Sequence, residues 1–367
     1  MMLEVVKFIK EHENWREILT ADPYMLRISE KDSLIMLNYT QGASAPCEIV
    51  NECRGLILDA ANDYKVIRYS FYRFYNYGED GAADLDFRSI RVQDKIDGSM
   101  VMLYWYDDRW HISTRSTFDC DNTPVHGNPS KTYGYLIKKA MHNQNINMYN
   151  LDKRYTHVFE LVSPDARVII HYSETKLYYL MSRNNETYEE VILPIGCIRP
   201  RYHMLSNFNG SMSAVEAFKE INDMANEYDG SKFEGFVVLD KHNNRVKVKN
   251  IDWIRLHILY NNGDVNEERS LNMFFTGESS EFLSYFPEYT GVVNASVSKY
   301  ERLLLLCGQL DRIDWKSNIT KKQLAELVKR TVHRPAYAEL IYKAYDHRAL
   351  KWFIELDLMW YIKLFGD

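Results

Sequence analysis

A lysine in a predicted turn is the first group of this chain that could act as a nucleophile. The segment Lys95-Ile96-Asp97-Gly98-Ser99 lies between strand-forming runs, and its glycine is typical of a turn. A lysine amine attacks an electrophilic centre once it has lost its proton. The pattern K-x-D-G is weak by itself, because roughly one chain in ten of this length contains it by chance. An exposed lysine in a turn is the alternative.

Two glutamates stand where apolar residues are expected. Glu160 lies within the run HVFELV, where alternation places it on the face opposite Phe159 and Leu161. A carboxylate in an otherwise apolar strand costs free energy unless a partner uses it. Glu234 begins a second apolar run, EGFVV. Both are candidates for binding a ligand.

Lys247 and Lys249 are two residues apart in the strand-like segment RVKVKN, so their side chains share a face. Adjacent lysines repel each other unless an anion lies between them. The alternative is a solvated pair on an edge strand. With Lys95 and the two glutamates, the pair would make a coherent site in which a nucleophilic amine faces a phosphate.

The order of these segments (K-x-D-G, then F-E-L, E-G-x-V-V and K-x-K) resembles the covalent nucleotidyltransferase superfamily of DNA ligases, RNA ligases and mRNA capping guanylyltransferases. Upstream, the segments E-C-R-G at 52–55 and R-F-Y-N at 73–76 resemble the bacteriophage T-even RNA ligase 1 family of tRNA-repair enzymes. The resemblance covers most of residues 30–260. The chain has Arg73, Arg115 and Trp253 where that family commonly has lysine, lysine and tyrosine. The first two positions keep their positive charge, but a planar guanidinium binds a phosphate with a different geometry from a compact ammonium group.

The resemblance implies an ATP-dependent RNA ligase that forms a lysyl-AMP intermediate on Lys95. It implies that Lys247 and Lys249 hold the α-phosphate, that Glu160 accepts from a ribose hydroxyl, and that Glu234 binds Mg²⁺ (or Mn²⁺). The substrates would be RNA 5′-phosphate and 3′-hydroxyl ends, with a broken tRNA as one candidate.

Further nucleotide contacts are implied by the same resemblance. Arg54 and Arg73 would hold the β- and γ-phosphates, and Tyr75 would support them. Leu180 or Tyr178 would pack on the adenine. The complete set of predicted nucleotide-binding residues is Arg54, Arg73, Tyr75, Asp97, Gly98, Arg115, Glu160 and Glu234.

Lys95 must be deprotonated to attack, although the pKa of a lysine is ordinarily near 10.4. Lys247, Lys249 and a divalent cation would lower the pKa of Lys95, whereas Asp97 would raise it. We expect the cations to dominate once metal-bound ATP is present.

The pattern of elements predicts an α+β protein with antiparallel sheets and an all-helical C-terminal domain. Short strand-like runs extend from 34 to 101 and recur at 157–162, 166–172 and 176–182, followed by a helix over 213–227 and a hairpin around 241–244. After Trp253, apolar residues repeat with helical spacing. We therefore expect an adenylyltransferase domain over 1–262 and a helical domain over 263–367 that could recognise RNA.

Composition favours a globular cytoplasmic protein. The chain has 367 residues, 46% of them hydrophobic, and a net charge of −6. This charge argues against a basic surface for nonspecific duplex binding but allows a local cationic groove. Five cysteines without a C-x-x-C pair fit a reducing compartment. No signal or membrane-spanning segment is predicted, and we expect a monomer.

Two alternatives compete with an RNA ligase. A DNA ligase or capping enzyme would normally carry a strand-rich domain after K-x-K, where this chain has helical patterns. A catalytically inactive RNA-end-binding protein would have no reason to retain these charged groups together. One predicted helix has basic residues that could contact an RNA backbone or form a solvated face; they are Lys321, Lys322, Lys329, Arg330 and Arg334.

Overall fold

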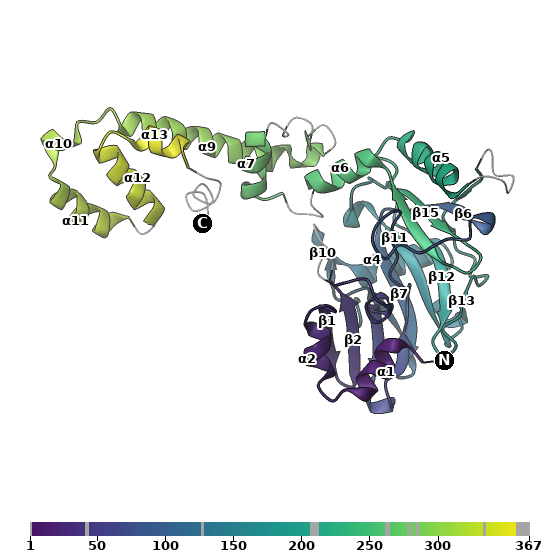
Figure 1. The fold of residues 1–367 in the computed structure, drawn as a ribbon. Coiled ribbons are helices and arrows are strands. Elements are labelled where there is room, and N and C mark those ends of the chain that lie inside the picture. The colour runs from purple at the N-terminus through teal and green to yellow at the C-terminus, as the bar shows by residue number, and fades with distance from the viewer. Residues whose placement is uncertain are drawn as a thin grey trace. The chain divides into compact units, whose positions relative to one another are not determined.

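The structure is a computed structural model that describes all residues except 1, 41–43, 126–127, 206–212, 261–264, 277–278, 280–281, 284–285, 333–334 and 357–367. The chain divides into two compact units, Met1–Gly263 and Asp264–Asp367. Strands and helices build the first unit, and helices build the second (Figure 1). The predicted α+β class with antiparallel sheets and C-terminal helices is confirmed.

The first sheet of unit 1 is an antiparallel meander in the order β1-β2-β3-β4. Its strands are β1 (Leu26–Lys31), β2 (Leu34–Tyr39), β3 (Arg54–Asp59) and β4 (Lys65–Arg68). Three helices share its core, namely α1 (Glu4–Glu11), α2 (Trp15–Thr20) and α3 (Glu48–Glu52). Residues 12–14 separate α1 from α2.

The second sheet has the order β13-β12-β11-β7-β8 and is antiparallel throughout. Its strands are β7 (Ser99–Tyr106), β8 (Arg109–Thr114), β11 (Tyr155–Val162), β12 (Lys176–Asn184) and β13 (Glu190–Val191). Helix α4 (Tyr133–Asn143) packs on it through Leu136, Ile137 and Ala140. Beside it lies a ribbon of β9 (Pro124–Val125) and β10 (Asn128–Thr132).

The third sheet has the order β14-β6-β15-β16-β5. Its strands are β5 (Tyr75–Asn76), β6 (Arg91–Asp94), β14 (Tyr202–His203), β15 (Gly235–Leu239) and β16 (Arg245–Lys249). β15 and β16 form the predicted hairpin, and β5 pairs with β16 in parallel. Helix α5 (Ala214–Asn226) covers this sheet through Ala217, Phe218 and Ile221, and α6 (Ile251–Tyr260) follows β16.

One predicted strand is wrong. Residues 166–172 form no strand; the 3₁₀ helix η4 (Pro164–Ala166) is followed by a bend. The amides of Ile169 and Ile170 donate to one oxygen of Asp97 at 2.8 and 2.6 Å, so a side chain takes the place of a neighbouring strand. The remaining 3₁₀ helices are η1 (Ala60–Asn62), η2 (Phe87–Ser89), η3 (Met148–Asn150) and η5 (Pro287–Tyr289).

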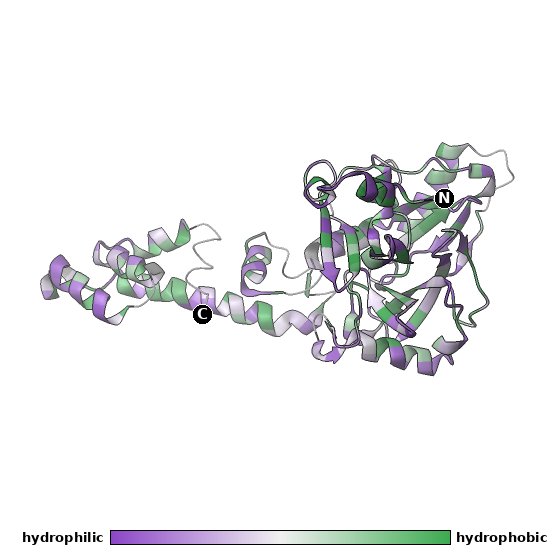
Figure 2. Cartoon of the chain, turned by 90° about the horizontal axis from the view of Figure 1, so that it is seen from below, coloured by the Kyte–Doolittle hydropathy of each residue, from purple (hydrophilic) through white to green (hydrophobic). Residues whose placement is uncertain are grey.

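Unit 2 consists of amphipathic helices, on which apolar (green) and polar (purple) residues alternate in Figure 2. They are α7 (Glu267–Thr276), α9 (Thr290–Leu310), α10 (Trp315–Asn318), α11 (Lys321–Thr331), α12 (Pro335–Tyr345) and α13 (Ala349–Ile354). Leu271, Cys307, Leu340 and Phe353 are buried at their centre. Within the described ranges, no helix has the length and apolar character that crossing a bilayer requires.

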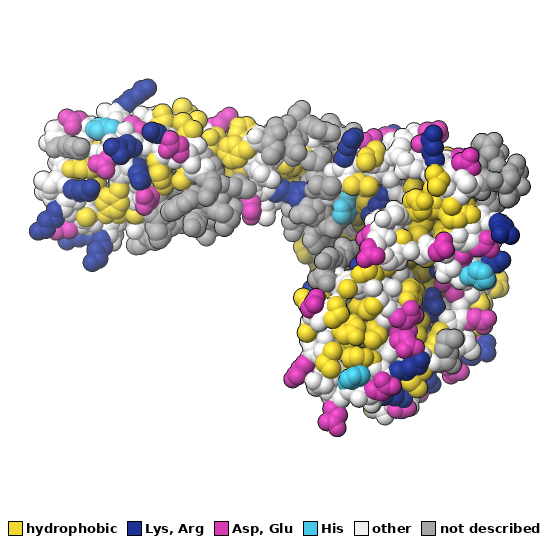
Figure 3. All heavy atoms as spheres, in the orientation of Figure 1, with side chains coloured by type: hydrophobic (Ala, Val, Ile, Leu, Met, Phe, Trp, Pro, Cys, Tyr) yellow, Lys and Arg dark blue, Asp and Glu magenta, His cyan; other side chains and the backbone are white. Residues whose placement is uncertain are grey.

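Helix α11 carries four of the five basic residues that the sequence placed on one helix, namely Lys321, Lys322, Lys329 and Arg330. Arg334 lies outside the described residues. Figure 3 shows Lys and Arg side chains, in dark blue, gathered at the end of unit 2 that contains α10 and α11. A role of this face in RNA binding stays a prediction.

A buried arginine joins the first sheet to the segment that follows β8. Arg68 is fully buried, and its guanidinium donates to the carbonyls of Gly55, Thr114 and Thr117 at 2.9, 3.0 and 2.7 Å. Burial lowers the pKa of Arg68 to about 10, so it stays charged at neutral pH. Because Gly55 follows Arg54, this contact fixes two parts of the chain that carry predicted site residues.

We expect Arg68→Met to destabilise unit 1 by more than about 3 kcal/mol, because each buried acceptor left without a donor costs roughly 1–3 kcal/mol. Urea unfolding followed by circular dichroism measures the loss. Arg109→Met, at an exposed arginine of β8, is the matched control and should change stability by no more than about 0.5 kcal/mol. Equal effects of both substitutions would contradict the role given to Arg68.

Candidate active site

A cavity of about 510 Å³ lies where the three sheets of unit 1 meet. Residues from β3, β11 and β16 line it, together with the turn after β6 that carries Lys95. Most of the predicted site residues are among its lining, namely Arg54, Lys95, Gly98, Arg115, Glu160, Leu180, Lys247 and Lys249.

Lys95 is held at the point where the chain passes from the third sheet to the second. Its amide donates to the carbonyl of Gly235 at 2.8 Å, which extends the pairing of β6 with β15. Three residues later, a Cβ atom on Gly98 would lie 2.4 Å from the carbonyl oxygen of Leu161. Only glycine permits this approach to β11. The K-x-D-G turn is therefore a crossing between sheets, and the lysine is fixed at its start.

The amine of Lys95 forms an ion pair with a buried carboxylate. Its Nζ lies 2.8 Å from Glu234, and the Nζ of Lys249 lies 4.0 Å from the same oxygen. Burial lowers the pKa of Lys95, but the negative charges of Glu234 and Glu160 outweigh burial and raise it. For Glu234, burial raises the pKa, and this effect outweighs the positive charge of Lys95, which lowers it. The protein groups by themselves therefore favour a protonated Lys95. Deprotonation would be favoured by added positive charge, such as the divalent cation expected to accompany ATP.

Asp97 stabilises the backbone next to Lys95. Its side chain is 3% exposed and accepts from the amides of Ile169 and Ile170. It does not line the cavity. Asp97 therefore holds the turn that presents Lys95 and contributes less to the pKa of Lys95 than Glu234 and Glu160 do.

Glu160 projects from the middle of β11, opposite Met100 of β7 and Tyr178 of β12. Burial raises the pKa of Glu160 to about 8, although Lys95 lowers it. Such a carboxyl group is costly to bury without a partner. Its place on the cavity wall allows it to bind a hydroxyl group there.

Lys247 and Lys249 lie on the inner strand β16, between β15 and β5, so they are not solvated lysines of an edge strand. The Nζ of Lys247 lies 5.3 Å from the ring centroid of Phe74, and that of Lys249 lies 4.5 Å from that of Trp253. Burial, with the charges of Arg54 and Lys95, lowers the pKa of Lys247 to about 7, and burial lowers the pKa of Lys249 too. An anion in the cavity would stabilise both cations.

Two of the three predicted arginines gather around Tyr39, which the sequence analysis did not single out. The guanidinium groups of Arg73 and Arg115 lie 4.3 and 4.6 Å from the centroid of its ring. Arg73 also lies 4.6 Å from the ring of Tyr75. Neither Arg73 nor Tyr75 lines the cavity, whereas Arg115 does.

Arg54 lines the same cavity as Arg115 and packs on a different ring, with its guanidinium 5.0 Å from the centroid of Phe74. Its buried Nε makes no hydrogen bond to the described residues, which leaves a donor for a ligand.

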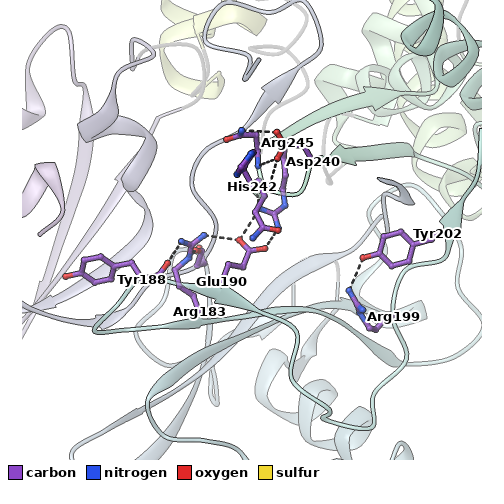
Figure 4. A network of polar contacts seen from close by, with 11 residues as sticks. Arg183, Tyr188, Glu190, Arg199, Tyr202, Asp240, His242 and Arg245 are labelled. Atoms are coloured by element: carbon purple, nitrogen blue, oxygen red, sulfur yellow. Dashed lines mark hydrogen bonds and ion pairs between the residues drawn. The ribbon is translucent and has the colours of Figure 1, made fainter. Parts of the chain in front are cut away.

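The sequence analysis also missed one arginine on the cavity wall. Arg245 precedes Lys247 by two residues and lines the cavity on the same strand. Glu190 binds Arg245 through both of its guanidinium nitrogens and binds Arg183 at 3.1 Å (Figure 4). This ion-pair cluster joins β16 to β12 and β13 of the second sheet. The alternation of Arg245 with Lys247 and Lys249 was the available signal.

No three His, Cys, Asp or Glu side chains converge on a metal position within the described parts of the chain. A cage made by protein ligands alone therefore does not fit. A single carboxylate such as Glu234 fits a hard cation that keeps most of its oxygen ligands from phosphates and water.

The RNA ligase family model of the T4 RNA ligase 1 type matches residues 52–254. This range is more than half of the chain and contains every predicted site residue, so the chain belongs to this RNA ligase family. The family predicted from the motifs is thereby confirmed.

Three known proteins illustrate the similarity. A protein of Autographa californica nuclear polyhedrosis virus, provisionally named a bifunctional polynucleotide kinase/RNA ligase, is 32% identical over 76% of this chain, which spans only 41% of that relative. An RNA ligase of Rhodothermus phage RM378 is 23% identical, covering 76% of this chain and 77% of the relative. An archaeal ATP-dependent RNA ligase structure is 10% identical with a TM-score of 0.43, covering 98% of this chain and 81% of that one; it is too distant to support an argument.

The ion pair predicts how the reactivity of Lys95 responds to substitution. Glu234→Gln removes the nearest negative charge, so the pKa of Lys95 should fall and its amine should be acylated at lower pH. Trace labelling with acetic anhydride across a pH series, followed by peptide mass spectrometry, gives the titration midpoint, with exposed Lys65 as the internal reference.

Glu174→Gln is the matched control, since Glu174 pairs with Lys176 at 2.6 Å on the surface. It should leave the midpoint of Lys95 unchanged. An unchanged or higher midpoint in Glu234→Gln would show that Glu234 does not control the proton on Lys95.

Proposed function

We propose that this chain is an ATP-dependent RNA ligase that joins 5′-phosphate and 3′-hydroxyl RNA ends through a lysyl-AMP intermediate on Lys95. The supporting observation is the convergence of Lys95 and Lys249, which line the cavity, on the buried carboxylate of Glu234 just outside its lining. A broken tRNA is a candidate substrate, by analogy with the family that the motifs resemble.

In the first step, the Nζ of Lys95 attacks the α-phosphorus of ATP. An N–P bond forms, the bond to the β-phosphate oxygen breaks, and pyrophosphate leaves. Lys95 must first release the proton that Glu234 and Glu160 stabilise. Lys247 and Lys249 stabilise the negative charge that develops on the α-phosphate. Arg54, with Arg73 and Arg115 near it, would bind the remaining phosphates.

The later steps use the same cations. An oxygen of the RNA 5′-phosphate attacks the AMP phosphorus, and Lys95 leaves. The 3′-hydroxyl of the other RNA end then attacks the activated 5′-phosphate, and AMP leaves. When bound, Mg²⁺ or Mn²⁺ would neutralise phosphate charge, with Glu234 as the protein ligand. Glu160 would accept from a ribose hydroxyl, and Leu180 would pack on the adenine.

The main alternative is a capping-type enzyme, which would form the covalent adduct from GTP and not from ATP. The described part of unit 2 contains helices and no strand, whereas a strand-rich domain would be expected there in a capping enzyme or a DNA ligase. An inactive RNA-end-binding protein would form no adduct.

We expect the protein to gain the mass of one AMP on Lys95 when it is incubated with ATP and magnesium. Intact-protein mass spectrometry and peptide mapping measure the adduct. Lys95→Ala should abolish it, whereas Lys131→Ala, outside the cavity, should not. An adduct on another residue would refute the assignment, and faster labelling by GTP would move the chain to the capping enzymes.

We expect Lys247→Ala and Lys249→Ala to slow both self-adenylation and the sealing of pre-adenylated RNA. In the first reaction the α-phosphorus of ATP is attacked, and in the second the AMP that contains this phosphate is the leaving group. Loss of such a contact typically reduces a rate roughly 10²–10³-fold. Lys95→Ala should lose only the first reaction. Arg54→Ala and Arg73→Ala, assigned to pyrophosphate, should impair the first reaction more than the last. Near-normal rates for both lysine variants would remove the proposed phosphate clamp.

A further inference from the structure

A second hollow, of about 340 Å³, lies next to the cavity of the candidate active site. Lys247 and Lys249 line both. The other walls of the second hollow come from Tyr77, which follows β5, and from Phe218 and Lys219 of α5. The two hollows are therefore adjacent spaces that share the lysine pair.

Tyr77 presents an aromatic surface at this hollow. Tyr77 is 49% exposed, and its ring stacks on Phe218, with centroids 3.3 Å apart and planes at 10°. The amide of Tyr77 donates to the carbonyl of Lys247 at 2.9 Å. The aromatic surface is thus attached to the strand that carries the lysine pair. A half-exposed aromatic ring of this kind is suited to stacking on a nucleobase.

The surroundings fit a base in the hollow and a phosphate at its boundary with the cavity. Val215, an exposed apolar residue, adds to the wall (73% exposed). Lys219 is exposed and makes no ion pair with the described residues. The nearby carboxylate of Glu79 accepts from the amide and side chain of Asn76 at 2.7 and 2.8 Å, so it is already engaged.

We propose that this hollow binds the base of the terminal RNA nucleotide that carries the 5′-phosphate. The base stacks on Tyr77, and its phosphate lies between the lysine pair and the AMP on Lys95. The lysine pair selects this end, because a 3′-hydroxyl end has no terminal phosphate to offer. The inference rests on the proposed ligase function and adds the position of one substrate strand to it.

Photocrosslinking with a 5′-phosphorylated RNA tests the position directly. With 5-iodouridine as its first nucleotide, the RNA should crosslink to Tyr77 or to the peptide containing α5, as identified by mass spectrometry. The same RNA with 5-iodouridine at its 3′ end should not. Crosslinks to this region from the 3′ end alone would overturn the proposal.

Binding and catalysis of variants give an independent test. Tyr77→Ala should weaken binding of the 5′-phosphorylated RNA about 5- to 150-fold, the range for loss of a stacking partner. Tyr77→Phe should retain binding because it keeps the ring. Lys219→Ala should cause a smaller loss that shrinks as salt is raised. Tyr135→Ala, at a tyrosine of α4 with similar exposure (52%), is the matched control and should have no effect.

Self-adenylation separates this inference from the proposed function. Tyr77→Ala should form lysyl-AMP at the normal rate, since the hollow takes RNA and not ATP. Normal RNA binding by Tyr77→Ala in a protein that adenylates normally would refute the inference alone. Absence of adenylation in the unsubstituted protein would refute the proposed ligase function.

Discussion

The passage of the chain between two sheets is the constraint on which the site depends. Lys95 is the last residue bonded to β15, and Gly98 is already pressed against β11. Only two residues separate these contacts, so the lysine backbone has little freedom. Asp97, between them, fixes the bend at 169–170. In the proposed reaction, a lysine held in this way would need little reorganisation before it attacks.

Charge balance is the second constraint, because several buried or half-buried ionisable groups lie close together at the cavity. The carboxylates raise the pKa of Lys95, whereas burial and neighbouring cations lower the pKa of Lys247. The two lysines are therefore tuned in opposite directions within one site. Incoming phosphates would stabilise the charge on Lys247 and Lys249, and a divalent cation near Glu234 would weaken its hold on the proton of Lys95. In the structure, without nucleotide or metal, the carboxylates thus favour the protonated form of Lys95.

The ion-pair cluster at Glu190 extends this arrangement beyond the cavity. Glu190 binds arginines from the second and third sheets, so the wall carrying Lys247 and Lys249 is tied to the sheet that carries Glu160. Arg68 does the same for the first sheet through backbone carbonyls. Arg245 had a signal in the sequence, which is its alternation with Lys247 and Lys249. The contacts that these arginines make between sheets depend on how the sheets pack, and the motifs do not contain them.

The sequence by itself determined the family, the α+β class and the residues of the nucleotide motifs, because these depend on local order and on the alternation of side chains along strands. The tertiary structure decided how those residues divide their tasks. It showed Asp97 holding a bend in place of a predicted strand, Glu234 paired with Lys95, and Arg73 and Tyr75 outside the lining of the cavity. It also brought Tyr39 and Arg245 to the cavity wall. Ion pairs and burial depend on contacts between residues far apart in the chain, and no local pattern encodes them.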